Sequence, residues 1–131
     1  MTTAAAPTLE DVRAAAVAIE PYLSLPTPLL QSPALSELLG AEVSLKLEFA
    51  TPIGAFKLRG GLNLVGQLSD AERAAGLVSA STGNHGQSVA YAAQLHGARA
   101  VIFVPEGANA DKIAAMERLG AEVRSEGERF D

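Results

Sequence analysis

The spacing of apolar side chains predicts a series of short elements in the first part of the chain. Over residues 8–19 they recur every three or four positions, after a threonine and an aspartate spaced as a capping box, which predicts a helix that ends before Pro21. Two prolines within residues 25–30 restrict that segment to an extended or edge conformation. Residues 33–39 predict a second helix, which Gly40 is placed to end.

The following segments switch between extended and helical patterns. Residues 42–49 alternate strictly between apolar and polar side chains, which predicts a half-buried strand. Residues 51–54 predict a turn, and residues 55–68 return to helical spacing. Ser69 and Glu72 have the spacing of another capping box, so a further helix is expected to begin there.

From residue 77 onward, strands and helices alternate regularly. The predicted strands cover residues 77–81, 100–104 and 122–125, and the predicted helices cover residues 85–96 and 110–119. This alternation is typical of βαβ units and predicts a parallel sheet with right-handed crossovers. A parallel sheet needs cover on both faces, and the chain reaches Asp131 soon after its last predicted strand. We therefore expect the sheet to be incomplete.

Composition and charge narrow the function classes. Hydrophobic residues make up 48% of the 131 positions, which excludes wholesale disorder. The net charge of -5, without a block of basic residues, argues against nucleic-acid binding, and no apolar run approaches the ~20 residues that span a bilayer. The start of the chain has no signal-peptide pattern. With no cysteine and two histidines, no metal site is expected, and a cytoplasmic protein is favoured.

The first candidate chemical segment is AFKLRGG, residues 55–61. Gly60 and Gly61 interrupt a helical pattern at a cost of about 1 kcal/mol each relative to alanine, which a closely approaching backbone or ligand would explain. Lys57 lies between two apolar residues, so we expect it to be buried. Burial favours a neutral amine that attacks aldehydes. The alternative is a solvated lysine at the start of an amphipathic helix.

The second candidate segment is SASTGNHGQS, residues 79–88, between a predicted strand and a predicted helix. Ligands of parallel α/β folds bind at the C-terminal ends of strands, and a helix N-terminus favours an anion. Small and polar residues in a row suit an amino-acid carboxylate. The alternative is an ordinary turn in which Asn84 caps the helix.

Together the two segments resemble the serine/threonine dehydratases, which are pyridoxal-phosphate dependent enzymes of the tryptophan-synthase-β-like group (fold type II). AFKLRGG resembles the family's Schiff-base motif, and STGNHGQSVAYAA, residues 81–93, resembles its asparagine loop and following helix. PTPLL before them and VPEGANADKIAAMERLGAEV after them also match. The similarity covers about residues 26–123.

The resemblance implies an α/β fold with a parallel three-layer α/β/α sheet of the fold type II kind, incomplete in this chain. Residues 1–20 would be an N-terminal tail and helix. Residues 21–131 would be the N-terminal portion of the family's catalytic body, truncated, with most of the small subdomain at about 75–131. The family's glycine-rich phosphate loop has no counterpart in this sequence, so we expect this chain alone to be inactive.

The resemblance also assigns roles to residues. Lys57 would bind pyridoxal 5′-phosphate covalently and move the substrate α-proton, Phe56 would pack near the cofactor, and Asn84 would contact the ring's 3-hydroxyl oxygen. Thr82 would be the second catalytic residue. The substrate carboxylate would be held by five consecutive residues: Ser81, Thr82, Gly83, Asn84 and His85.

The implied activity is α,β-elimination of L-threonine or L-serine to a 2-oxo acid and ammonia in the full-length protein, which would be a homo-oligomer. Ile53 stands where the motif usually has a small or hydroxyl residue, and Thr82 stands where relatives carry Ala or Ser. A racemase or another fold type II enzyme therefore remains an alternative. So do a split enzyme completed by another chain and a catalytically incompetent α/β module.

Overall fold

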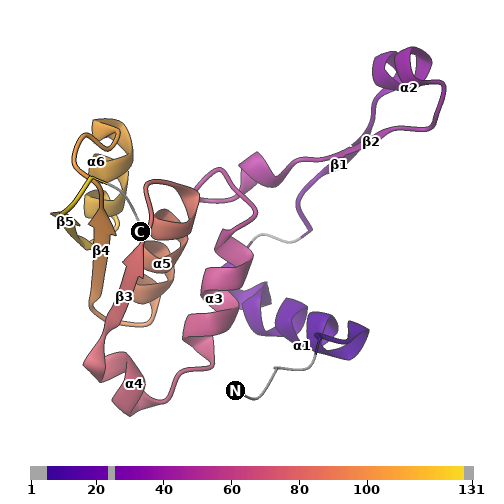
Figure 1. Cartoon of the computed structure of the whole chain (residues 1–131). Coiled ribbons are helices and arrows are strands. Elements are labelled where there is room, and N and C mark those ends of the chain that lie inside the picture. Colours follow the sequence, from indigo (N-terminus) through magenta and orange to yellow (C-terminus); the bar gives the residue numbers. More distant parts are fainter. Residues whose placement is uncertain (1–5, 24–25, 129–131) are drawn as a thin grey trace.

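The computed structural model describes residues 6–23 and 26–128, and Figure 1 shows the order of its elements. The helices are α1 (Leu9–Ile19), α2 (Pro33–Leu39), α3 (Leu58–Gly66), α4 (Asp70–Ala75), α5 (Asn84–Leu95) and α6 (Ala110–Arg118), with 3-10 turns η1 (Glu20–Tyr22) and η2 (Glu48–Ala50). The strands are β1 (Leu29–Gln31), β2 (Ser44–Lys46), β3 (Leu77–Ala80), β4 (Ala100–Val104) and β5 (Glu122–Ser125). The predicted tail and extended segment fall partly on residues 1–5 and 24–25, outside the described residues.

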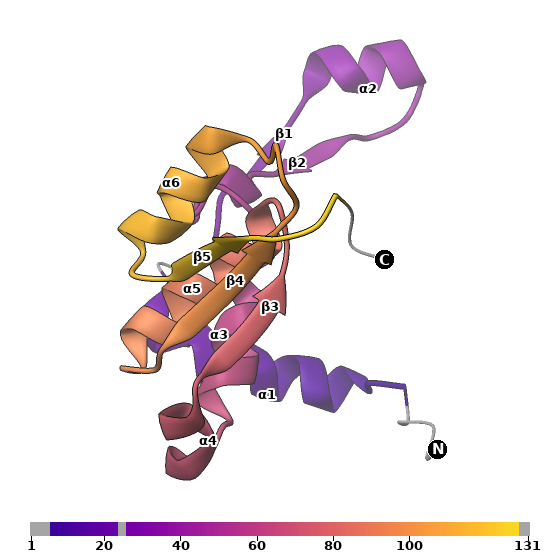
Figure 2. The same ribbon diagram turned by 60° about the vertical axis from the view of Figure 1, so that its left-hand side comes forward.

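The second half of the chain forms a parallel sheet in the order β3-β4-β5. Val78 pairs with Val101, and Ile102 pairs with Val123, so the strands run in register through two successive βαβ units. Figure 2 shows the three strands side by side with α5 behind them. The predicted α/β class and parallel sheet are therefore confirmed.

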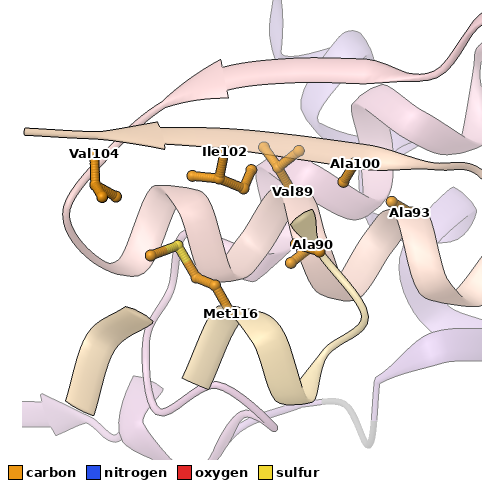
Figure 3. Close-up of a cluster of buried hydrophobic side chains, with 8 residues drawn as sticks. Val89, Ala90, Ala93, Ala100, Ile102, Val104 and Met116 are labelled. Atoms are coloured by element: carbon orange, nitrogen blue, oxygen red, sulfur yellow. The ribbon is translucent and has the colours of Figure 1, made fainter. Parts of the chain in front are cut away.

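Both connecting helices cover the same face of this sheet. Alternate residues of β4 point toward side chains of α5 and α6, because successive strand residues face opposite sides. Figure 3 shows this cluster, in which Ile102 and Met116 are completely buried. Each large apolar side chain buried in this way stabilises the fold by roughly 1.5–3 kcal/mol. On the other face Val78 is 75% exposed, so within the described residues the layering is incomplete, as predicted.

A second apolar cluster joins α3 to the side of α5 that faces away from the sheet. Leu58, Leu62 and Val65 of α3 are buried there against Ala92 of α5 and Ile19 of α1. These three α3 residues are the helical stripe that the sequence predicted, although the helix itself is shorter than residues 55–68. α5 therefore lies between the sheet and α3, which brings the two candidate segments together.

The segment from β1 to β2 projects away from the rest of the molecule (Figure 1). β1 and β2 pair antiparallel, with Leu30 opposite Leu45, and α2 connects them. The predicted half-buried strand over residues 42–49 is wrong in length and burial, since only Ser44–Lys46 is extended and all three residues are exposed. The alternating pattern created an apolar face, but no described element packs on it.

Two local predictions are confirmed at the helix starts. The Thr8 and Asp11 side chains form a reciprocal capping box on α1, and Ser69 and Glu72 form another on α4. The hydroxyl and backbone of each cap residue donate to the acidic partner and lower the pKa of the Asp11 and Glu72 carboxyls. Among the described residues, no helix is long and apolar enough to cross a membrane.

Candidate active site

Lys57 lies at the N-terminal end of α3, immediately after a tight turn. The buried Thr51 hydroxyl builds this turn, because it accepts from the Ala55 amide at 2.9 Å and donates to the Ala55 carbonyl at 2.9 Å. The lysine is the N-cap residue of the helix, with no side-chain capping bond. The turn therefore consumes residues that the sequence assigned to the helix, and it leaves Lys57 at the outer end of α3.

The loop after β3 begins with Ser81, whose backbone amide continues the ladder to the Phe103 carbonyl at 3.0 Å. The Ser81 hydroxyl accepts from the Gly83 amide at 3.3 Å and the Gly86 amide at 3.0 Å. It thereby replaces the missing cap at Gly83, which is the N-cap residue of α5 and has no side chain. As an acceptor Ser81 is committed to the loop, but its O–H remains able to donate to a ligand.

Thr82, Asn84 and His85 are exposed, and their side chains form no hydrogen bond with any described residue. Thr82 and Asn84 flank Gly83 at the start of the twelve-residue helix α5. The first amides of a helix have no intrahelical acceptor, and the helix dipole adds partial positive charge at that end. This end of α5 therefore offers uncommitted donors suited to a carboxylate or another anion.

A direct contact joins the two segments. The Ser88 hydroxyl of α5 donates to the Lys57 carbonyl at 2.7 Å, and Ser88 is completely buried. Gly61 of α3 faces the same serine, and a Cβ placed there would lie 2.8 Å from the Ser88 carbonyl oxygen. The close backbone approach predicted from the paired glycines is thus present at Gly61. At Gly60, a Cβ would meet nothing within 4 Å.

An open groove of about 420 Å³ runs beside this contact. Its lining is mainly apolar and consists of Phe56, Lys57, Arg59, Gly60, Gly61, Leu64, His85 and Val89. The prediction that Lys57 is buried is wrong for the described structure, where the residue is exposed and its Nζ lies 6.0 Å from the centroid of the Phe56 ring. The reason is its place at the end of α3, where no described element covers it.

An ion-pair network near the lysine turn was not anticipated from the sequence. The Arg59 guanidinium donates to both carboxylate oxygens of Glu48, at 2.8 and 2.9 Å, and to the Thr27 hydroxyl at 3.1 Å. This pairing lowers the pKa of Glu48 and raises that of Arg59. Lys46 donates to the Thr27 carbonyl at 2.5 Å. The network ties α3 to η2 and to the start of the projecting segment, at separations that no local pattern reveals.

The described residues contain no cluster of three or more metal-ligating side chains. They do contain a lysine that opens on a mainly apolar groove, next to a loop with free donors. An amine and an anion-binding loop at this spacing fit a carbonyl cofactor that carries an amino-acid substrate.

Comparison with known proteins decides the family. The model of the pyridoxal-phosphate dependent enzyme family matches residues 22–131. The chain belongs to this family. The predicted resemblance and the predicted cofactor class are therefore confirmed at the level of the family, whose described members are pyridoxal-phosphate dependent.

The relatives in this family include both lyases and racemases. The chain is 44% identical over 95% of its length to the L-threonine ammonia-lyase of Thermotoga maritima, and 39% identical over 89% to the serine racemase of Schizosaccharomyces pombe. It superposes on maize serine racemase with a TM-score of 0.90 (32% identity, 96% of this chain and 38% of that one) and on a threonine deaminase from T.th. with 0.83 (41% identity, 95% and 38%). These neighbours confirm the fold type II architecture.

This chain spans 31% of the length of the Thermotoga relative and 36% of that of the Schizosaccharomyces relative. The putative threonine dehydratase of Sinorhizobium fredii is 44% identical over 94% of this chain, which corresponds to 37% of that protein. The family match therefore concerns about a third of a typical relative, the part that holds the lysine turn and the loop after β3.

Proposed function

We propose that this chain supplies the lysine and the carboxylate-binding loop of a pyridoxal-phosphate dependent lyase that converts L-threonine or L-serine to a 2-oxo acid and ammonia. The observation that carries the proposal is the junction of the two segments. The lysine turn and the helix that follows the loop share the Ser88–Lys57 hydrogen bond, and Lys57 and His85 line one groove. The activity itself belongs to a protein of the relatives' length.

Each residue of the groove has a defined task in this proposal. The Lys57 amine holds the cofactor and takes or returns the proton at the substrate α-carbon, while Phe56 packs against the cofactor ring. The Asn84 side chain, free in this structure, donates to the ring oxygen. When bound, pyridoxal phosphate supplies the electron sink for the α-carbanion.

The substrate carboxylate lies at the N-terminus of α5. The Ser81 O–H, the Thr82 hydroxyl and the uncommitted amides of Asn84 and His85 all serve as donors there, next to Gly83. The helix dipole favours the negative charge by about 0.3–1 kcal/mol at an exposed site. A small amino acid is therefore the substrate class, and a homo-oligomeric, cytoplasmic full-length protein completes the proposal.

Racemisation is the second candidate, because serine racemases stand beside the lyases among the relatives and structural neighbours. Thr82 would then return a proton from the face opposite Lys57. A full-length protein that releases 2-oxo acid and ammonia from L-threonine supports the lyase. One that yields D-serine with little 2-oxo acid supports the racemase.

The lysine assignment is testable in this chain alone. Pyridoxal 5′-phosphate is added, its adducts with lysine are reduced with borohydride, and the label is mapped by mass spectrometry over the three lysines, Lys46, Lys57 and Lys112. We expect the label to concentrate at Lys57 and L-serine to compete with it. Lys57→Arg is the control that keeps the charge. Equal labelling of the three lysines would contradict the proposal.

A further inference from the structure

Ser88 makes a contact that its own helix does not require. Serine inside a helix usually bonds the carbonyl one turn earlier on the same helix or turns to solvent. In this chain it reaches across to α3 and donates to the Lys57 carbonyl at 2.7 Å. The residue is completely buried, so water does not compete for its hydroxyl.

The acceptor does not need this bond for its own satisfaction. The Lys57 carbonyl already accepts from the Gly60 amide at 3.1 Å and the Gly61 amide at 3.3 Å in the first turn of α3. Removal of the Ser88 hydroxyl would leave no buried unpaired carbonyl at position 57. The hydroxyl therefore adds mainly the location of the lysine backbone relative to α5.

The packing around Ser88 makes that location specific. Gly61 brings the backbone of α3 so close to Ser88 that a Cβ would lie 2.8 Å from its carbonyl oxygen. Ser88 is also one helical turn after Asn84, the first residue of α5. One helical turn and one hydrogen bond thus connect the loop that begins at Ser81 to the backbone of Lys57.

We propose that Ser88 is a positioning residue, which sets the distance between the Lys57 amine and the donor loop of residues 81–85. The inference rests on the proposed function, because it assigns Ser88 a role in placing the reactive lysine. It differs from a packing role in one measurable respect: loss of the hydroxyl changes the chemistry of Lys57 more than it changes the stability of the chain.

The test compares Ser88→Ala with Ala92→Gly. Ala92 lies four residues further along α5, is completely buried, and belongs to the cluster that packs on α3. Ala92→Gly removes a methyl group and weakens the helix, whereas Ser88→Ala improves helix propensity, so the control is the more destabilising variant. Both chains are labelled with pyridoxal 5′-phosphate and borohydride at a temperature where circular dichroism finds them folded.

The readout is the label at Lys57 divided by the label at Lys46 and Lys112. We expect Ser88→Ala to lower this ratio about fivefold, the loss that corresponds to one ordinary hydrogen bond. Ala92→Gly is expected to leave the ratio within about twofold of the parent chain. Ser88→Cys retains a weak donor, so its ratio should lie between those of Ser88→Ala and the parent chain.

Two results would overturn the inference while the proposed function stands: an unchanged ratio in Ser88→Ala, or an equal fall in Ala92→Gly, which would assign the effect to packing. A parent chain without preference for Lys57 would instead remove the proposed function, and the role of Ser88 with it. The three results are distinguishable in one set of peptide maps.

Discussion

The two faces of α3 differ sharply in what surrounds them. On the face toward α5, Leu58, Leu62 and Val65 are at most 1% exposed, and Gly61 lies against Ser88. On the face toward the groove, Leu64 is 55% exposed, and Gly60 has open space where a side chain would be. One helix therefore serves the core on one side and leaves the other side free beside Lys57.

The comparison teaches that a helical glycine pair has two separate causes. Gly61 is needed because the backbone of α5 occupies the space of its Cβ. Gly60 has no such neighbour among the described residues, and it lines the groove that contains Lys57. Gly61 is thus explained by packing within the chain, and Gly60 by the need for an open groove. Substitutions on each face should separate these causes.

The largest effect is expected on the packed face at Leu62. Leu62→Ala should lower the free energy of unfolding by about 2–5 kcal/mol, because it removes a fully buried side chain and leaves a cavity between α3 and α5. Urea unfolding followed by circular dichroism measures the change. Leu64→Ala is the matched control on the open face, and a loss there as large as at Leu62 would contradict the distinction between the faces.

A smaller loss is expected at Gly61. Gly61→Ala should destabilise the chain by about 1–3 kcal/mol, despite the better helix propensity of alanine, because the new methyl group forces α3 away from α5. Thermal unfolding gives the sign directly. A stabilised Gly61→Ala variant would mean that the close contact with Ser88 is absent in solution.

The ion pair beside the lysine turn should give the chain an acid-sensitive component. Arg59, by donating to Glu48, holds the pKa of that carboxyl below its ordinary value. The stabilisation is therefore present above about pH 4.3, the ordinary value for glutamate, and is lost as the pH falls through the folded-state pKa. Glu48→Gln should cost about 1 kcal/mol at neutral pH, since the pair is partly exposed.

The measurement for this pair is urea unfolding of the parent chain and Glu48→Gln between pH 7 and pH 3. The difference between the two curves should shrink on acidification. Asp11 and Glu72 are present in both chains, so the acid dependence of the two capping boxes cancels. A difference that stays constant with pH would show that Glu48 does not act through its charge.

The smallest effect, of opposite sign, is expected at Gly60. Gly60→Ala should stabilise the chain by about 0.5–1 kcal/mol, because alanine favours the helix and meets no neighbour. The same variant should reduce cofactor labelling of Lys57, since the added methyl group enters the groove. A variant that is both more stable and labelled as well as the parent chain would leave Gly60 without a role in the groove.

Much of the fold could be predicted from local pattern. The strands at Ala100–Val104 and Glu122–Ser125 and the helix at Pro33–Leu39 have the predicted bounds, because their apolar runs end at glycine or proline or at a polar turn. The strand expected over residues 42–49 is mostly absent. An alternating pattern specifies a face but not the layer that must cover it.

The candidate site could be predicted only in part. The residue types at Lys57 and in the loop from Ser81 to His85 are visible in the sequence, and the roles assigned to them remain proposals. The exposure of Lys57 and the Ser88 bond were not foreseeable, because both depend on how α3 crosses α5.

The sequence by itself determined the class of fold, the capping boxes and the two chemical segments, because hydrophobic periodicity and capping act over a few neighbouring residues. Only the tertiary structure decided that Gly61 meets Ser88, that Arg59 pairs with Glu48, and that Lys57 opens on a groove. These contacts join residues 11 to 31 positions apart or depend on which surfaces other elements cover. No local pattern encodes the angle at which two helices pack, and that angle sets the distances in the site.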